Sequence, residues 1–323
     1  MTSTTCDRRL TAAALAAGVL LASGCRERPA ATSAGASGES GEASAAATAG
    51  TTPRGEVARY RLSGAPVRRV TLPDELREIS GLALSSDGRL FAHGDEEATV
   101  FQIDPATGQV LERFRLAPAG EEPDLGKKAR KGRVAGDFED MAIVEDRFFL
   151  VTSNGVLLEF AEGGDGASVP YTSHPTGLGE RCEVEGLTYD AGAGELLLLC
   201  KEFHVKAERG RVAAYGWSIA DRRLEPTPRI VVPYAALRPL IGTGAFNGSA
   251  LALTPGGRSV VLVAGPQRLF VEITADGRVV EGGPLDRAAV EQPEGIAFLR
   301  DGALLISSEG GRGAATLNAY AAR

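Results

Sequence analysis

A short β-hairpin pattern recurs five times along the chain and restricts the folds that the chain can adopt. Each copy has a polar residue two places before Leu, Ile or Met, then a turn, then a strongly apolar strand. The first strands of the five copies cover residues 78–83, 137–142, 183–188, 247–252 and 292–297. The copies begin roughly 45–65 residues apart, which is enough for about four strands each. This period predicts a β-propeller, because only neighbouring units can cover the apolar faces of each unit.

The number of copies predicts five blades in an all-β domain over residues 56–323. Six blades would result if residues 205–235 formed a blade of their own. The last copy is short, so we expect an N-terminal strand within 57–62 or 67–72 to complete it and close the ring. The polar insertion at 117–134 is expected to be a surface loop.

The overall charge argues against one broad class of function. The chain carries a formal net charge of −7 and has a pI of about 5.3. General nucleic-acid binders are basic, so we expect no nucleic-acid partner. We expect a monomer.

The N-terminus has the features of an export signal. Arg8 and Arg9 precede an apolar stretch of 12 residues, 10–21, which is too short to span a bilayer of about 30 Å. The sequence Leu21-Ala22-Ser23-Gly24, which immediately precedes Cys25, resembles a bacterial lipobox. Ala22 stands where Leu, Val or Ile is usual. We therefore expect residues 1–24 to be a lipoprotein signal peptide and Cys25 to be lipidated. An ordinary signal peptide is the alternative.

Residues 25–55 are rich in Ala, Ser, Gly and Thr. Such a segment buries too little apolar surface to become ordered, so we expect a flexible tether. The protein would then be exported and attached to a membrane of the cell envelope through the lipid on Cys25. Arg26 is consistent with the periplasmic side of an outer membrane, if the cell has one.

Two cysteines of the expected domain, Cys182 and Cys200, bracket the third hairpin, whose turn at 190–194 lies midway between them. They should therefore face one another across an antiparallel strand pair. A disulfide is expected in an oxidising compartment, and two buried thiols are the alternative.

Polar residues recur at three equivalent positions of the repeat. The first position is occupied by Glu78, Asp137, Glu183, Asn247 and Gln292, and the second by Ser80, Glu139, Glu185, Ser249 and Glu294. The third, at the end of the second strand, is occupied by Asp95, Asn154, Glu202, Pro266 and Glu309. Equivalent positions of a propeller form rings around its channel, and residues i and i+2 of a strand face the same way.

Oxygen ligands gathered around a channel suit Ca²⁺ better than zinc or copper. We expect Ca²⁺ to be bound by some of the metal candidates Glu139, Glu185, Glu294, Asn154, Glu202, Asp95 and Glu309. The candidates for binding a polar ligand are Glu78, Asp137, Glu183, His93 and Asn247. Lys201 could pair with a carboxylate of this ring. In the alternative, these Glu residues only hydrogen-bond the backbone of neighbouring blades.

The third hairpin, Cys-Glu-Val-Glu-Gly-Leu-Thr-Tyr-Asp, and the closing Gln-Pro-Glu-Gly-Ile-Ala-Phe are similar to motifs of the SdiA-regulated family of exported bacterial β-propellers. The resemblance covers about 76–320. It implies a secreted or membrane-anchored propeller with an acidic calcium site, and it implies no defined reaction.

Two functions are compatible with this sequence. The first is a calcium-binding module that holds a small polar or protein ligand, or serves as a scaffold. The second is a metal-dependent hydrolase of lactones or phosphoesters, as in lactonase-like or phytase-like propellers. The first is preferred, because no nucleophile motif of the Gly-x-Ser-x-Gly type is present.

Overall fold

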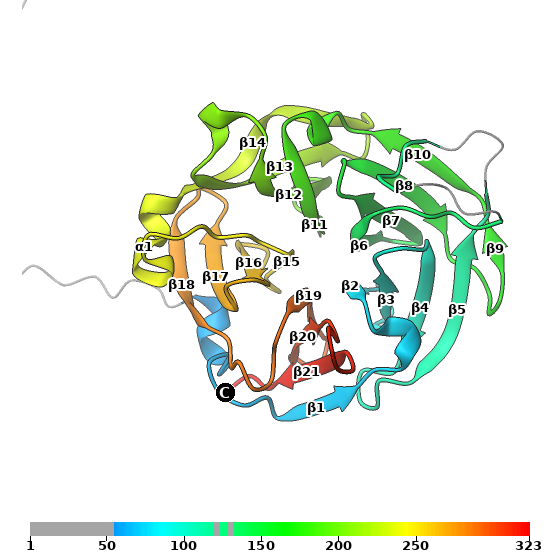
Figure 1. The fold of residues 1–323 in the computed structure, drawn as a ribbon, viewed down its shortest axis with the longest axis horizontal. Helices are drawn as coiled ribbons and strands as arrows, with labels where there is room; N and C mark the ends of the chain where they lie inside the picture. Colours follow the sequence, from blue (N-terminus) through cyan, green and yellow to red (C-terminus); the bar gives the residue numbers. More distant parts are fainter. Residues whose placement is uncertain (1–54, 119–122, 128–131) are drawn as a thin grey trace, which may run out of the picture. The chain divides into compact units, whose positions relative to one another are not determined.

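A computed structural model describes residues 55–118, 123–127 and 132–323. The expected signal peptide, Cys25 and nearly all of the expected tether lie outside these residues. The described chain forms five β-sheets arranged around a central axis (Figure 1). Among the described residues, no helix has both the length and the hydrophobicity needed to cross a membrane.

Each sheet is one blade, and its neighbouring strands are mostly consecutive in sequence and, apart from one short edge strand, antiparallel. Blade 1 contains β2 (Ile79–Leu84), β3 (Leu90–Gly94), β4 (Thr99–Ile103), β5 (Val110–Leu116) and the short β9 (Ser168–Val169), which pairs parallel with β5. Blade 2 contains β6 (Phe138–Val144), β7 (Arg147–Thr152), β8 (Val156–Ala161) and β10 (Tyr171–Pro175). Blade 3 contains β11 (Cys182–Asp190), β12 (Glu195–Phe203), β13 (Arg211–Ser218) and β14 (Arg223–Pro233). Blade 4 contains β15 (Ala250–Leu253), β16 (Ser259–Ala264), β17 (Leu269–Thr274) and β18 (Val279–Pro284).

Blade 5 joins the two ends of the described chain. It contains β19 (Pro293–Phe298), β20 (Leu304–Ser308), β21 (Thr316–Tyr320) and the N-terminal β1 (Arg68–Thr71). The expected closing strand is therefore found within 67–72. Residues 57–62 form no strand, because Glu56–Arg59 is the short 3-10 helix η1.

The prediction of an all-β, five-bladed propeller is confirmed. The alternative of six blades is wrong, because β13 and β14 are the outer strands of blade 3: β13 pairs with β12, and β14 pairs with β13. Helices are few and lie in connections: η2 (Asp74–Leu76), η3 (Leu178–Glu180), η4 (Lys206–Glu208) and α1 (Tyr234–Ile241).

The hydrophobic core lies between the blades. One cluster joins Phe149 of blade 2 to Leu198 and Trp217 of blade 3, and the Phe149 and Trp217 ring centroids are 6.1 Å apart. Another joins Phe91 of blade 1 to Phe148 of blade 2, whose rings meet edge to face with centroids 5.0 Å apart. Burial of such side chains contributes about 1.5–3 kcal/mol each, so the stability of each blade depends on its neighbours.

A disulfide joins Cys182 and Cys200, whose Cα atoms are 5.6 Å apart. The two residues are not directly opposite, because Cys182 pairs with Phe203 while Cys200 pairs with Val184. Irregular pairing between these positions brings the two side chains together across blade 3.

Candidate functional site

A β-bulge interrupts the innermost strand of four blades at the same place in the repeat. The shifts in strand pairing fall at Ser80 of β2, Glu139 of β6, Glu185 of β11 and Glu294 of β19. A bulge adds one unpaired residue and changes the direction of its side chain. The second polar position of the repeat is therefore the one at which a bulge redirects the side chain in four blades.

The bulges also correct one expectation. Strict alternation along the strand would make the first and second polar positions point together. The first position is instead more open: Glu78 and Gln292 are exposed, and Asp137 accepts a hydrogen bond of 2.7 Å from Ser153. Only in blade 3 do the two positions share a partner, because both Glu183 and Glu185 contact Lys201.

Lys201 lies at an irregularity of β12 that faces the one in β11. Glu202 and Cys200 each pair with a residue of β11, and Lys201 between them pairs with none. Its Nζ is 2.5 Å from Glu185 Oε1 and 3.5 Å from Glu183 Oε1. Burial alone would lower the pKa of Lys201, but the carboxylates of Glu185 and Glu183 outweigh burial and raise it. Lys201 therefore keeps its positive charge and pairs with Glu185.

Three more carboxyl groups lie close enough to Glu185 to affect one another. Burial, followed by the charge of Glu185, raises the pKa of Glu139 to about 10 and that of Glu294 to about 8. Burial raises the pKa of Glu185 itself to about 7, although Lys201 opposes this. The pKa of Asp140, which is 2% exposed, is also raised by burial. A single ammonium group cannot balance these carboxyls, so without another cation Glu139 and Glu294 are protonated at neutral pH.

Two wholly buried polar atoms next to this cluster have no hydrogen-bond partner within the described chain. They are His93 Nε2 and Ser307 Oγ, and both residues are 0% exposed. His93 Nδ1 lies 2.9 Å from the carbonyl oxygen of Gly94, so Nδ1 carries the proton and Nε2 is an acceptor. Burial lowers the pKa of His93 to about 4, so the ring is neutral.

Glycine at two positions makes room for these groups. A Cβ atom on Gly81 would lie 2.5 Å from His93 Nε2 and 2.6 Å from Asp140 Oδ1. A Cβ atom on Gly295 would lie 2.7 Å from Ser307 Oγ. Buried polar atoms are normally satisfied by protein or ordered water, so each of these two atoms has capacity for a further hydrogen bond.

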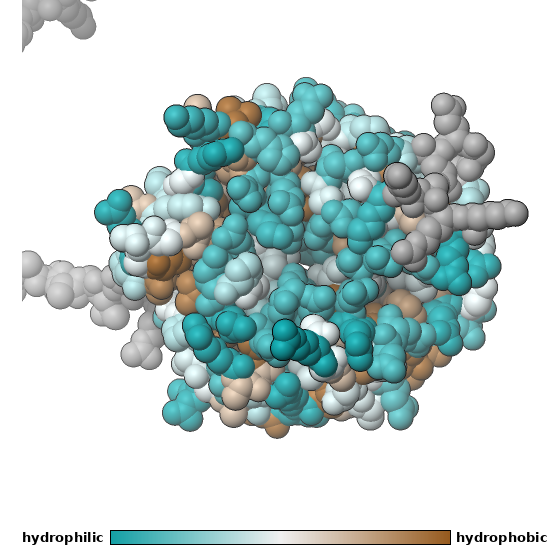
Figure 2. All heavy atoms as spheres, viewed as in Figure 1, coloured by the Kyte–Doolittle hydropathy of each residue, from teal (hydrophilic) through white to brown (hydrophobic). Residues whose placement is uncertain are grey.

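Two cavities lie beside the inner strands, one between blades 3, 4 and 5 and the other along all five blades. The first, of about 280 Å³, is lined by Glu185, Lys201, Ser249, Glu294 and neighbouring residues near the strand starts. The second, of about 300 Å³, is lined by largely apolar residues further along the same strands, including Ile143 and Leu253. The polar candidate site is therefore confined to one end of the inner strands. Hydrophilic residues surround the centre of the face seen in Figure 2.

The other predicted residues do not join this cluster. Asp95 bonds Lys127 at 3.0 Å, and Asn154 donates to the carbonyl of Asp124 at 2.9 Å. Glu309 pairs with Gln292, Asn247 pairs with Gln267 at 2.8 Å, and Glu202 is exposed. Of the seven metal candidates, the structure brings together Glu139, Glu185 and Glu294.

One member of the cluster was not predicted. Asp140 takes the place that Gly81, Gly186 and Gly295 occupy in other copies, and this departure from the repeat was its only signal in the sequence. Its carboxylate accepts N–H groups of Met141 and Leu187, both at 2.8 Å, so it also links blades 2 and 3. The alternative interpretation, in which a carboxylate bonds the backbone of a neighbouring blade, thus describes Asp140.

The chemical type of the ligand atoms in this cluster suits a hard cation, because these atoms are mainly carboxyl oxygens. Within the described residues, however, no group of three or more His, Cys, Asp or Glu side chains is arranged so that it could hold a metal ion. A cation here would need water molecules among its ligands.

Comparison with known proteins supports the fold alone. No protein-family model matches the sequence, and no curated protein matches it either. The structure is similar to that of glutaminyl cyclase from Myxococcus xanthus, with a TM-score of 0.50 and 14% identity over 79% of this chain and 94% of that one. It is also similar to the PQQ-bound aldose sugar dehydrogenase of Streptomyces coelicolor, with a TM-score of 0.47 and 12% identity over 79% and 97% of the two chains.

Proposed function

We propose that this protein is an exported ligand-binding propeller that takes up a hydrated Ca²⁺ ion at the polar end of its inner strands. The supporting observation is the charge imbalance there: Glu139, Glu185 and Glu294 share the charge of one ammonium group, Lys201, and Asp140 lies near Glu185 and Glu294. A divalent cation would replace the protons that these carboxyls otherwise retain. Its water molecules would give His93 Nε2 and Ser307 Oγ hydrogen-bond partners.

The cellular location of the protein is part of the same proposal. We propose lipidation at Cys25, attachment to the cell envelope, and membership of the SdiA-regulated family. These rest on the lipobox-like sequence and on the resemblance of the hairpin motifs. The bound ion would then support recognition of a small polar or protein ligand at the same face.

Calcium titration tests the proposal directly. Isothermal titration of the wild type with CaCl₂ should show saturable binding, and proton release should appear as a dependence of the heat on the ionisation enthalpy of the buffer. Glu294→Gln should weaken binding by at least about tenfold, equivalent to about 1.4 kcal/mol. Glu112→Gln, at an exposed position of β5, is the matched control and should bind as the wild type does. Absence of saturable heat, or equal binding by both variants, would contradict the proposal.

One observation favours a second function, metal-dependent hydrolysis. Within the described parts of the chain, Nε2 of the neutral His93 imidazole and the Ser307 hydroxyl have no hydrogen-bond partner, and both lie next to the carboxyl cluster. With Ca²⁺ present, a neutral imidazole of this kind can act as a general base. Turnover in a screen of lactones, phosphate esters and phytate, lost in Glu185→Gln, would support this function. Calcium binding without turnover of any of these would support the binding module.

A further inference from the structure

The described chain enters the propeller at the end opposite the carboxyl cluster, which we call the far end. The cluster lies near the starts of the inner strands, whereas Glu56 contacts the turn that follows the inner strand of blade 4. Its carboxylate accepts the N–H of Gly256 at 3.2 Å and lies 3.3 Å from a guanidinium nitrogen of Arg258. The connection toward Cys25 therefore joins the domain at the far end.

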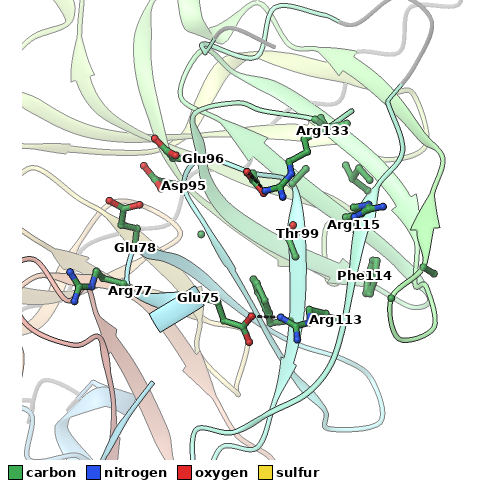
Figure 3. Close-up of a pocket in the computed structure, with 18 of the residues that line it drawn as sticks. Glu75, Arg77, Glu78, Asp95, Glu96, Thr99, Arg113, Phe114, Arg115 and Arg133 are labelled. Atoms are coloured by element: carbon green, nitrogen blue, oxygen red, sulfur yellow. Dashed lines mark hydrogen bonds and ion pairs between the residues drawn. The ribbon is translucent and has the colours of Figure 1, made fainter. Parts of the chain in front are cut away.

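Positive charge is concentrated in the segment that follows. Residues 57–73 contain no acidic residue and four arginines, Arg59, Arg61, Arg68 and Arg69. All four are exposed, and none forms an ion pair with any described residue. Arg113 over blade 1 differs in this respect, because it pairs with Glu75 (Figure 3). The segment is therefore a local region of unpaired positive charge in a chain whose formal net charge is −7.

Two of these arginines are held at the far end by the tyrosine between them. The Tyr60 hydroxyl donates to the carbonyl of Gly302 at 2.9 Å, in the turn that follows the inner strand of blade 5. Tyr60 is buried, and the centre of its ring lies 5.4 Å from the guanidinium carbon of Arg59. Anchoring of this ring leaves the side chains of Arg59 and Arg61 in solvent on either side of it.

A third arginine lies at the same end. Arg68 donates to the carbonyl of Pro105 at 3.2 Å, in the turn between β4 and β5. Successive strands of blade 1 run in opposite directions, so this turn lies at the same end as the turn that follows the inner strand β2. Arg69 points to the other face of β1, where it donates to the carbonyl of Ala288 at 2.8 Å. The surface at the far end therefore contains three of the four arginines.

An apolar side chain lies among these arginines. Val67 is 70% exposed, more than any other large hydrophobic residue of the described chain. Together with Arg61 it lines a shallow cavity of about 360 Å³ that has no Asp or Glu in its lining. The nearby carboxylates of Asp286 and Asp301 accept N–H groups of their own loops, each at 3.0 Å. An exposed apolar residue among unpaired arginines is typical of surfaces that lie at a membrane interface.

We propose that the far end of the propeller docks on an anionic lipid bilayer through Arg59, Arg61 and Arg68, with Val67 at the level of the headgroups. The carboxyl cluster then faces away from the membrane, toward soluble ligands. The acidic remainder of the chain does not prevent this contact, because charges more than about 10 Å apart are largely screened at 0.1 M salt. This orienting role rests on the lipid attachment proposed above.

A form of the chain that begins at Arg26 tests the docking without any lipid anchor, and it contains every described residue. It should sediment with phosphatidylcholine vesicles that contain about one-third phosphatidylglycerol, and its partition into pure phosphatidylcholine should be at least about tenfold lower. A rise in NaCl from about 0.05 M to about 0.5 M should also lower partition at least about tenfold, because salt screens the attraction. Equal partition into both kinds of vesicle, or none into either, would overturn the proposal.

A triple variant assigns the contact to the three arginines. Arg59→Gln/Arg61→Gln/Arg68→Gln should partition at least about tenfold less into the anionic vesicles, because each arginine near such a surface is worth roughly a factor of five. The matched control changes net charge equally at exposed arginines elsewhere. It is Arg77→Gln/Arg238→Gln/Arg312→Gln, which should bind as the wild type does. Circular dichroism should confirm that both variants fold. Equal losses in the two would show that net charge alone matters and would contradict the assignment.

Single fluorescent labels test the orientation. The chain from Arg26 has no free thiol other than an introduced one, because its two cysteines form the disulfide. An environment-sensitive label at Val67→Cys should shift to the blue on anionic vesicles. A label at Val205→Cys, which is 44% exposed in the connection from β12 to β13 at the opposite end, should not shift. Equal shifts at both positions would overturn the orientation. Lipidation is tested separately, by the mass of the peptide that contains Cys25, so the two proposals can fail independently.

Discussion

At the scale of single residues, the candidate site depends on where one side chain per blade is directed. Glu139, Glu185 and Glu294 occupy bulges. Of the residues two places earlier, Gln292 is exposed and Asp137 bonds Ser153, whereas Glu183 shares Lys201 with Glu185. Burial is the largest cause of the raised pKa of all three carboxyls, ahead of any neighbouring charge. The charge of Lys201 opposes this rise in all three carboxyls, and it also hydrogen-bonds its direct partner, Glu185.

The stability of the protein should therefore depend on pH in an unusual direction. Carboxyls whose pKa is higher in the folded state than in the unfolded chain bind more protons when folded, so stability is greatest at low pH and is lost as pH rises. For Glu185 and Glu294 the window runs from the ordinary glutamate pKa of 4.5 up to their folded-state pKa values of about 7 and about 8. Without Ca²⁺, the free energy of unfolding in urea should fall by at least about 1 kcal/mol between about pH 5.5 and about pH 8.5.

Saturating Ca²⁺ should reverse this trend, because the ion binds the ionised carboxyls of the folded protein. Glu294→Gln should flatten the dependence seen without Ca²⁺, while Glu112→Gln should leave it as it is. A free energy of unfolding that rises across this range without Ca²⁺ would show that the buried carboxyls are ionised in the folded state.

At the scale of elements, the hairpin of β11 and β12 supplies Glu183, Glu185 and Lys201, more of the site than any other hairpin of the described chain. Both strands are irregular where these side chains project, and irregular pairing weakens a strand pair locally. The disulfide between Cys182 and Cys200 spans the same irregular region. We infer that it compensates for the lost pairing and fixes the positions of Glu185 and Lys201.

Reduction of this disulfide should destabilise the protein measurably. A crosslink between residues 18 apart in sequence is worth roughly 3 kcal/mol through its effect on the unfolded chain. The midpoint of urea unfolding should fall accordingly when the wild type is treated with a reductant. The Cys182→Ala/Cys200→Ala double variant is the control, since its midpoint should not respond to the reductant. An unchanged midpoint in the reduced wild type would exclude a stabilising role.

At the scale of the whole molecule, the ring is held closed by the N-terminal segment of the described chain. Glu272 of blade 4, which is 2% exposed, accepts the N–H groups of Glu56 at 3.0 Å and Val57 at 2.8 Å. The chain then buries Val57, Tyr60 and Leu62 against blades 4 and 5, and β1 completes blade 5. One segment therefore connects the last two blades.

Removal of this segment should destabilise the entire propeller. A variant that begins at Leu72 loses three buried side chains worth about 1.5–3 kcal/mol each, in addition to the pairing of β1. Compared with a variant that begins at Gly55, its Tm measured by circular dichroism should be lower by at least about 10 °C, or it should fail to fold. Val67→Ser, at a residue that is 70% exposed, is the control and should leave Tm unchanged. Equal Tm values for the two truncated forms would show that blade 5 is stable without β1.

The sequence by itself determined the architecture, because fold class and blade number follow from a pattern that repeats. Five copies of a hairpin whose apolar faces need neighbours allow little other than a closed ring. The short fifth copy indicated that an N-terminal strand from 57–62 or 67–72 would complete it, and the structure decided for 67–72. The pattern also identified Glu139, Glu185 and Glu294 as equivalent positions.

Only the tertiary structure decided which polar positions meet. The period of two along a strand predicted that Glu78 and Ser80, or Asp137 and Glu139, would face the same way, and the bulges interrupt that period. Asp140 broke the glycine pattern without showing what it would contact, since its partner Leu187 belongs to another blade. Burial, which raises the pKa values of the cluster, arises from residues distant in sequence.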